Sequence, residues 1–146
     1  MEKLTNNEYK TDVSGITLRF VREGEEGTVL HFIRAIAAYE KMSDCVIATE
    51  EGLHRAIFEQ HACNVLLIEQ EGVPVGFCLY FHTFSTFCGR TNLYLEDIFL
   101  NEEVRGRGIG REVFRVLMEI ALEEGCERLE WVCLNWNAQS IAFYRR

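Results

Sequence analysis

Apolar residues along the chain follow two spacings, one typical of strands and one typical of helices. Strand-like apolar runs predict strands at 16–22, 65–70, 73–81, 92–100 and 129–134. Apolar residues three and four apart predict helices at 25–39 and 111–124, and 50–60 is a plausible third helix. Only Glu71 and Gly72 separate two of the strands, which predicts a hairpin. We expect a mobile loop at 82–90.

Two of these strands flank a predicted helix. Strand 92–100, helix 111–124 and strand 129–134 form a crossover unit, with Gly125 expected to end the helix. Strands joined in this way are parallel neighbours with a right-handed crossover connection, whereas the remaining strands can pair antiparallel.

Composition limits the classes of protein. A chain of 146 residues, 48% hydrophobic and 26% charged, suits one globular domain. The first residues are polar and resemble neither a secretion signal nor a membrane span, so we expect a flexible tail at 1–14 and the domain at 15–146. Six cysteines without a C-x-x-C pair suggest reduced thiols in a cytoplasmic protein. The net charge of −8 argues against nucleic-acid binding and suits a cationic small substrate, or simply solubility.

A glycine-rich turn, Arg-Gly-Arg-Gly-Ile-Gly at 105–110, opens directly onto the helix at 111–124. The first N–H groups of a helix lack intrahelical partners and carry partial positive charge, so they bind anions. Gly106, Gly108 and Gly110 let a ligand approach the main chain, and Arg105, Arg107 and Arg111 add positive charge. The pattern predicts a pyrophosphate site, the alternative being a flexible basic turn. It lacks the Lys-Ser/Thr of a P-loop and the G-x-G-x-x-G of a dinucleotide fold.

Two flanking segments extend this pattern. Residues 93–100 read Leu-Tyr-Leu-Glu-Asp-Ile-Phe-Leu, and residues 135–144 read Asn-Trp-Asn-Ala-Gln-Ser-Ile-Ala-Phe-Tyr. With 105–110 they resemble, in order and spacing, the motifs of GNAT-type N-acetyltransferases. Within that family the chain is most similar to diamine (spermidine/spermine) and thialysine acetyltransferases, which also share a segment like 38–42. The resemblance covers about residues 17–146.

This resemblance implies a fold and a co-substrate. The fold is a single α/β domain of the α+β type, in which helices flank a mixed, mostly antiparallel sheet with a central parallel pair. That pair splays apart, and the pantetheine arm of acetyl-CoA binds the main chain of the first strand. The implied acetyl-CoA contacts are Ile98, Phe99, Leu100, Arg105, Gly106, Arg107, Gly108, Ile109, Gly110, Arg111, Asn137 and Tyr144.

The implied reaction is direct attack of a primary amine on the thioester. Glu96 is the candidate base, acting directly or through water, and Tyr144 is the candidate acid for the leaving thiolate. The implied substrate-binding residues are Tyr39, Glu40, Glu96, Asp97 and Trp136. Alternatively, Glu96 and Asp97 are solvated carboxylates, of which only one can face a given pocket because neighbouring strand residues point to opposite sides. Tyr144 is alternatively a packing residue. No Cys–His constellation or metal-ligand spacing is visible, so no metal is predicted.

The carboxy-terminal segment departs from the family, whose domains normally continue through a further strand. We expect a last helix after Asn137, at 138–145, and an unpaired edge beside strand 129–134. Exposed edges recruit other chains, so this edge predicts a homodimer contact. The departure also keeps a second hypothesis open, a degenerate acetyl-CoA-binding or interaction module without turnover.

Overall fold

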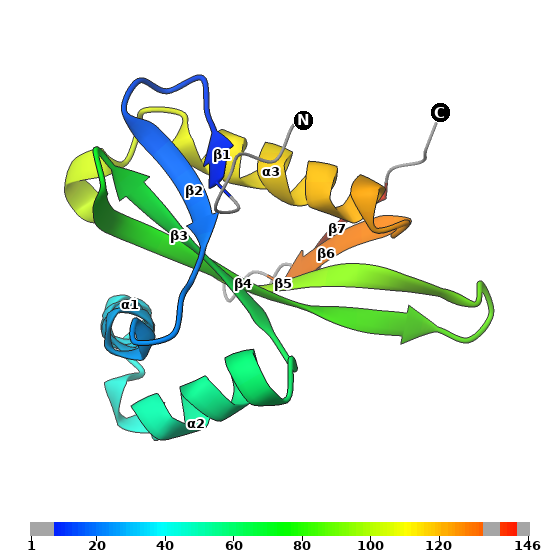
Figure 1. Cartoon of the computed structure of the whole chain (residues 1–146), viewed down its shortest axis with the longest axis horizontal. Coiled ribbons are helices and arrows are strands. Elements are labelled where there is room, and N and C mark those ends of the chain that lie inside the picture. Colours follow the sequence, from blue (N-terminus) through cyan, green and yellow to red (C-terminus); the bar gives the residue numbers. More distant parts are fainter. Residues whose placement is uncertain (1–7, 133–137, 143–146) are drawn as a thin grey trace.

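The computed structural model describes residues 8–132 and 138–142 and shows one twisted sheet (Figure 1). Its seven strands lie in chain order: β1 (Glu8–Lys10), β2 (Ile16–Phe20), β3 (Asn64–Gln70), β4 (Val73–Ser85), β5 (Arg90–Leu100), β6 (Arg128–Val132) and β7 (Ala138–Ala142). Every neighbouring pair is antiparallel except β5 and β6, which are parallel. The predicted mixed, mostly antiparallel sheet with one central parallel pair is therefore confirmed.

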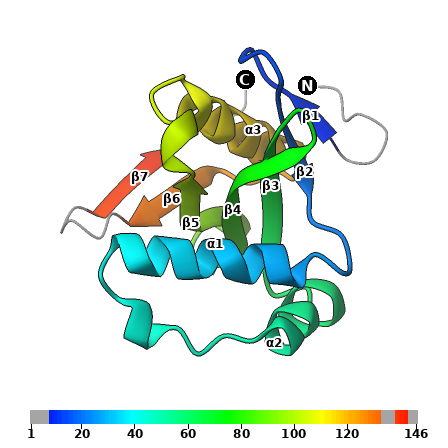
Figure 2. The same cartoon turned by 90° about the vertical axis from the view of Figure 1, so that its left-hand side faces the viewer.

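Helices cover both faces of this sheet (Figure 2). On one face lie α1 (Glu26–Tyr39), the 3-10 turn η1 (Ser43–Cys45), and α2 (Glu50–His54), which continues as the π-helical turn η2 (Arg55–Glu59). On the other face lies α3 (Ile109–Glu123), preceded by the 3-10 turn η3 (Glu102–Val104). Each face has its own core: Leu93 and Leu95 pack beneath α3, whereas Leu67 and Phe77 pack beneath α1.

Local signals placed most element ends correctly. Helix α3 ends where Gly125 was expected to end it, with φ of 80° at the glycine and the Cys126 N–H donating to the Ala121 carbonyl at 2.8 Å. The expected hairpin of β3 and β4 is confirmed, and Glu71 and Gly72 both have positive φ, of 49° and 85°. The longest described helix, α3, has 15 residues, and no described helix could cross a membrane.

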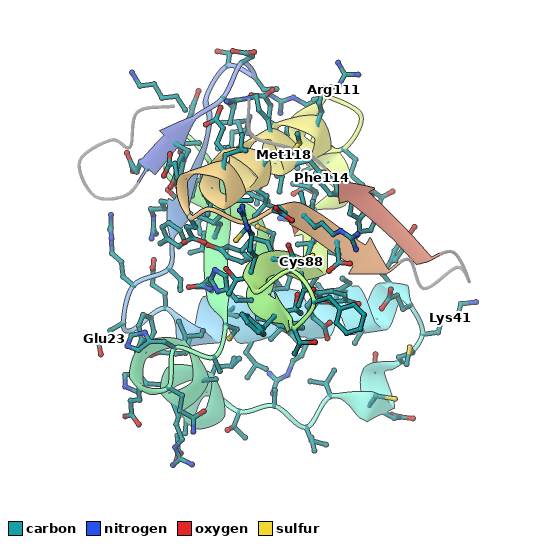
Figure 3. All side chains as sticks on the ribbon, turned by 90° about the vertical axis from the view of Figure 1, so that its right-hand side faces the viewer. Glu23, Lys41, Cys88, Arg111, Phe114 and Met118 are labelled. Atoms are coloured by element: carbon teal, nitrogen blue, oxygen red, sulfur yellow. The ribbon has the colours of Figure 1, made fainter. Side chains whose placement is uncertain are left out.

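The prediction of a mobile loop at 82–90 is wrong. Strand β4 continues to Ser85 and β5 begins at Arg90, so the two strands form an arm that projects from the body (Figure 1). Figure 3 views this arm from its tip, where Cys88 lies, with Glu23 and Lys41 near the two ends of α1. Aromatic and β-branched residues at 81–84 favour the extended conformation, and the cross-strand ladder adds the stability that the short pattern did not reveal.

The prediction of a flexible tail at 1–14 is wrong from residue 8 onward. Strand β1 pairs with β2, and Tyr9 is fully buried. Two long-range hydrogen bonds hold the following residues to α3: the Asp12 N–H donates to Glu112 at 2.8 Å, and Arg115 donates to the Lys10 carbonyl at 3.0 Å. These contacts join residues about one hundred positions apart, which no local pattern can show.

The helix expected at 138–145 is wrong over residues 138–142. Strand β7 pairs antiparallel with β6, for example with Ile141 opposite Leu129. The prediction of an unpaired edge beside strand 129–134 is therefore wrong over 128–132, where β7 pairs with β6. An unpaired edge at these residues no longer argues for a homodimer contact.

Candidate active site

The central parallel pair opens toward one end of the sheet. Among the residues that the structure describes, β6 pairs with β5 only at Leu93, Tyr94 and Leu95. Beyond that point, residues 97–100 of β5 pair with β4 and with no other described strand. Their other edge therefore leaves backbone groups available to an extended ligand, as the resemblance implies, although the Leu100 carbonyl already accepts a hydrogen bond from Arg105. Ile98, Phe99 and Leu100 lie on this edge.

A β-bulge interrupts β5 where the opening begins. Asp97 lies opposite Leu79 and Leu95 lies opposite Tyr80, so Glu96 is an extra residue in the ladder. Leu95 and Ile98 both pack in the core beneath α3, although three positions separate them. Since side chains normally alternate, the two residues between them both face the side of α1. The bulge thus removes the regular alternation on which the expectation that only one of Glu96 and Asp97 can face a given pocket rested.

Three carboxylates gather on that face. Glu40 follows the last residue of α1, Glu96 is exposed, and Asp97 is half-buried. Burial, followed by the charges of Glu96 and Glu40, raises the pKa of Asp97 to about 6. A carboxyl with this pKa is largely ionised at neutral pH and can still accept a proton, which suits it to a general base.

A largely apolar cavity of about 330 Å³ lies beside these carboxylates, between the end of α1 and the end of β5. Its lining residues are Ile36, Tyr39, Glu40, Ile98, Phe99, Leu100 and Arg105. Among these, Ile36 was not predicted; the only sequence signal for it is its place one helical turn before Tyr39 and Glu40. The cavity thus joins the expected substrate segment of α1 to the expected co-substrate edge of β5.

Arg105 forms one wall of this cavity. Its Nε donates to the Leu100 carbonyl at 2.8 Å. Its guanidinium lies 5.1 Å from the centre of the Tyr39 ring and 5.3 Å from that of Phe99, within the range of cation–π attraction. The side chain of Arg105 therefore lies against the cavity, whereas the sequence assigned it to the glycine turn, as added positive charge and an implied acetyl-CoA contact.

The glycine turn leads into α3 at the same end of the sheet. Gly106 and Gly108 have φ of 77° and 83°, a region that other residues rarely adopt. Helix α3 begins at Ile109, two residues earlier than expected, so the free helical N–H groups include those of Ile109, Gly110 and Arg111. The side chain of Ile109 is buried, which leaves its backbone to meet a ligand.

Open space surrounds this turn. A Cβ atom added at Gly106, Gly108 or Gly110 would meet no atom beyond its chain neighbours within 4 Å in the described part of the chain. Arg107 and Arg111 are exposed beside it, and Figure 3 shows Arg111 at the start of α3, with Phe114 and Met118 further along the helix. Free N–H groups, a helix dipole and two arginines fit a phosphate or pyrophosphate. Trp136, Asn137 and Tyr144, the other expected site residues, lie outside the described residues.

Comparisons with known proteins agree with this geometry. Residues 33–146 match the model of the acetyltransferase (GNAT) family. The chain is 37% identical over 139 residues to a thialysine N-epsilon-acetyltransferase of Bos taurus, covering 89% of this chain and 81% of that protein. It is 29% identical over 143 residues to a human spermidine/spermine N(1)-acetyltransferase-like protein 1, covering 92% of this chain and 20% of that protein.

A solved structure has the same fold. The aminoglycoside acetyltransferase meta-AAC0020, from an uncultured soil metagenomic sample, superposes with a TM-score of 0.71 at 16% identity, covering 90% of this chain and 96% of that one. With its splayed strands, its glycine turn at a helix start and these matches, the chain belongs to the GNAT acetyltransferase family. It is an acetyl-CoA-dependent N-acetyltransferase that transfers an acetyl group to a primary amine.

Proposed function

We propose that the acceptor is a small cationic amine, bound at the carboxylates beside the cavity and acetylated by direct attack on the thioester. The observation that supports this proposal is the bulge at Glu96, next to Asp97, whose pKa the charges of both Glu96 and Glu40 raise. Three carboxylates in one place attract a positively charged substrate. Two similar proteins are named for thialysine and for spermidine or spermine, which are also amines with a positive charge.

The acceptor must lose a proton before it attacks, because a lysine-like amine has a pKa of about 10.4. In our proposal, Glu96 removes this proton directly or through water. The neighbouring carboxylate of Asp97, whose pKa is raised to about 6, can share this proton with Glu96. The neutral nitrogen forms a bond to the thioester carbon, and the bond from that carbon to sulfur breaks. Tyr144 gives its proton to the leaving thiolate, and the second proton that the nitrogen loses as the amide forms returns to the Tyr144 oxygen, so that one proton in total passes from the carboxylates to solvent.

The remaining expected roles belong to the same proposal. The main chain of Ile98, Phe99 and Leu100 holds the pantetheine arm, and the N–H groups from Gly106 to Arg111 hold the pyrophosphate, with Arg107 and Arg111 adding charge. Asn137 contributes to the acetyl-CoA site. Tyr39, Glu40 and Trp136 form walls of the acceptor site. Holding both reactants in place supplies much of the acceleration.

Turnover on a matched set of amines tests the acceptor. Release of CoA is measured with acetyl-CoA and with thialysine, lysine, spermidine, and a neutral-tailed amine of similar length. We expect kcat/KM to be at least about tenfold higher for the amines that carry a second positive charge, the scale of one desolvated charge contact. A preference for the neutral-tailed amine contradicts the proposed acceptor. Acetyl-CoA binding without turnover on any amine supports the binding module instead.

We also propose that the protein is a cytoplasmic homodimer. Among the described strands, β1 and β7 form the two outer edges of the sheet, and the proposed contact uses the outer edge of β7, next to β6. Light scattering at tens of micromolar protein measures the mass directly, and a monomer at that concentration contradicts the dimer.

A further inference from the structure

Three side chains with metal-binding atoms meet at the carboxy-terminal end of α3. They are His82 of β4, Glu124, which follows α3, and Cys126. Their ligand atoms all lie within 4.8 Å of one another, and Nε2 of His82 lies 2.8 Å from Oε1 of Glu124. They come from two segments about forty residues apart, so the spacing of cysteines and histidines along the chain could not reveal them.

The backbone around two of these residues is rigid. Gly125 adopts φ of 80° and ends α3, and this turn is held by hydrogen bonds from the N–H of Glu124 to Ile120 and from that of Cys126 to Ala121. Cys126 is 1% exposed, and its Sγ lies 3.8 Å from Oγ1 of Thr91. His82 lies opposite Leu93 in the ladder of β4 and β5. A site on elements of this kind needs only small side-chain rotations to bind an ion.

Negative charge accumulates at this end of α3. The carbonyl end of a helix carries about half a negative charge, and the last turn of α3 has no basic residue to compensate it. Burial, and then Glu123, Glu124 and Glu119, raise the pKa of Tyr9 to about 12. The Tyr9 hydroxyl is buried and has no hydrogen-bond partner among the described residues. A bound cation would stabilise this end of the helix.

We propose that His82, Glu124 and Cys126 bind one Zn²⁺ ion at the base of the arm formed by β4 and β5. Imidazole nitrogen, carboxylate oxygen and thiolate sulfur are the ligands that Zn²⁺ takes, and water can complete a tetrahedral shell. The thiolate disfavours Mg²⁺ and Ca²⁺, which prefer oxygen. On binding, the sulfur of Cys126 bonds to zinc and its proton passes to solvent, so the affinity falls as the pH falls.

The ion has a structural role in this proposal. His82 belongs to the arm, Glu124 directly follows α3, and Cys126 lies two residues before β6, so one ion joins three parts of the fold. It lies at the opposite end of α3 from the glycine turn, because α3 has 15 residues and each adds about 1.5 Å.

Metal titration of the full chain tests the site without measuring activity. Protein stripped with a chelator is titrated with Zn²⁺, and with Co²⁺ as a spectroscopic probe. We expect saturable binding of one ion per chain, a sulfur-to-cobalt charge-transfer band, and a melting temperature that rises with Zn²⁺ but not with Mg²⁺. His82→Ala should weaken binding by at least about tenfold, and Cys126→Ser should remove the charge-transfer band.

Two matched variants serve as controls. His31→Ala and Cys88→Ser change an exposed histidine and an exposed cysteine outside the cluster and should leave binding unchanged. Should Cys126→Ser fail to fold, His82→Ala and Glu124→Gln decide the question, because both side chains are partly exposed. Absence of saturable Zn²⁺ binding, or binding that is unchanged in His82→Ala, overturns the proposal.

Discussion

Leu95 and Ile98 are three positions apart on β5, yet both side chains pack in the same core beneath α3. An uninterrupted strand would place them on opposite faces. The bulge at Glu96 removes this conflict, because it adds one residue to β5 opposite Leu79 and Tyr80. Its consequence for chemistry is a pair of neighbouring carboxylates on one face, beside the open edge of the strand.

The pH dependence of turnover should report the ionisation of the Asp97 carboxyl. Because its pKa is raised to about 6, the carboxylate is present above that pH and is lost as the pH falls through it. We expect kcat/KM to fall below about pH 6 in the wild type. Asp97→Asn should lower the rate by roughly 10²-fold at neutral pH and abolish this inflection. The control, Glu103→Gln, changes an exposed carboxylate on η3 and should keep the wild-type profile. An inflection that persists in Asp97→Asn contradicts the assignment.

The same substitution should stabilise the protein at high pH. The pKa of Asp97 is raised from 3.8 to about 6 on folding, so its ionised form is disfavoured in the folded state. The resulting loss of stability is fully present above pH 6 and disappears as the pH falls toward 4. Asp97→Asn should therefore melt at a higher temperature than the wild type at pH 8, and the difference should shrink by pH 4. Equal melting temperatures at pH 8 would show that Asp97 carries no such cost.

Gly110→Val should block acetyl-CoA. Gly110 lies in the first turn of α3, and a Cβ atom added there meets no described atom beyond its chain neighbours within 4 Å, so a larger side chain should extend into the space proposed for the pyrophosphate. Acetyl-CoA at one hundred times its Kd should stabilise the wild type by about 2.7 kcal/mol, and this gain should be lost in Gly110→Val. Gly110→Ala, a smaller change at the same position, should lose less. Calorimetry in which both variants keep the full gain contradicts the placement.

Tyr144→Phe removes one hydroxyl and tests the proposed acid. We expect kcat to fall by roughly 10²-fold while the affinity for acetyl-CoA changes little, the pattern of an interaction made only in the transition state. The comparison needs kcat from steady-state kinetics and Kd from titration of acetyl-CoA. A variant with wild-type kcat assigns Tyr144 to packing alone.

A histidine–carboxylate contact between α1 and α2 should make stability depend on pH. Nδ1 of His54 lies 2.7 Å from Oε2 of Glu26. This hydrogen bond raises the pKa of His54 above 6.5 and lowers that of Glu26 below 4.5. The histidine contribution is complete below pH 6.5 and is lost as the pH rises through the raised pKa. The glutamate contribution is present above pH 4.5 and is lost at lower pH.

The two contributions overlap between about pH 4.5 and 6.5. The difference in melting temperature between the wild type and His54→Gln should be largest in that window and smaller at pH 8.5. A difference for His54→Gln that does not vary with pH would rule out the ionic contact.

Local patterns in the sequence determined much of this protein. The periodicity of α1 and α3, the positive-φ turn at Glu71 and Gly72, and the helix end at Gly125 all follow from neighbouring residues and are confirmed. The glycine turn and the strand before it also identified the family, because their chemistry depends on backbone geometry within a few residues.

Tertiary structure decided what depends on residues far apart in the chain. Strand β7, the pairing of Tyr9, and the joining of His82 to Glu124 and Cys126 require partners that no local window contains. The bulge is the clearest case, since Glu96 and Asp97 read as alternating positions until β4 is placed opposite them. The position of a residue along a strand determines which face its side chain points to only while the hydrogen-bond ladder is regular. Whether the ladder is regular depends on the partner strand.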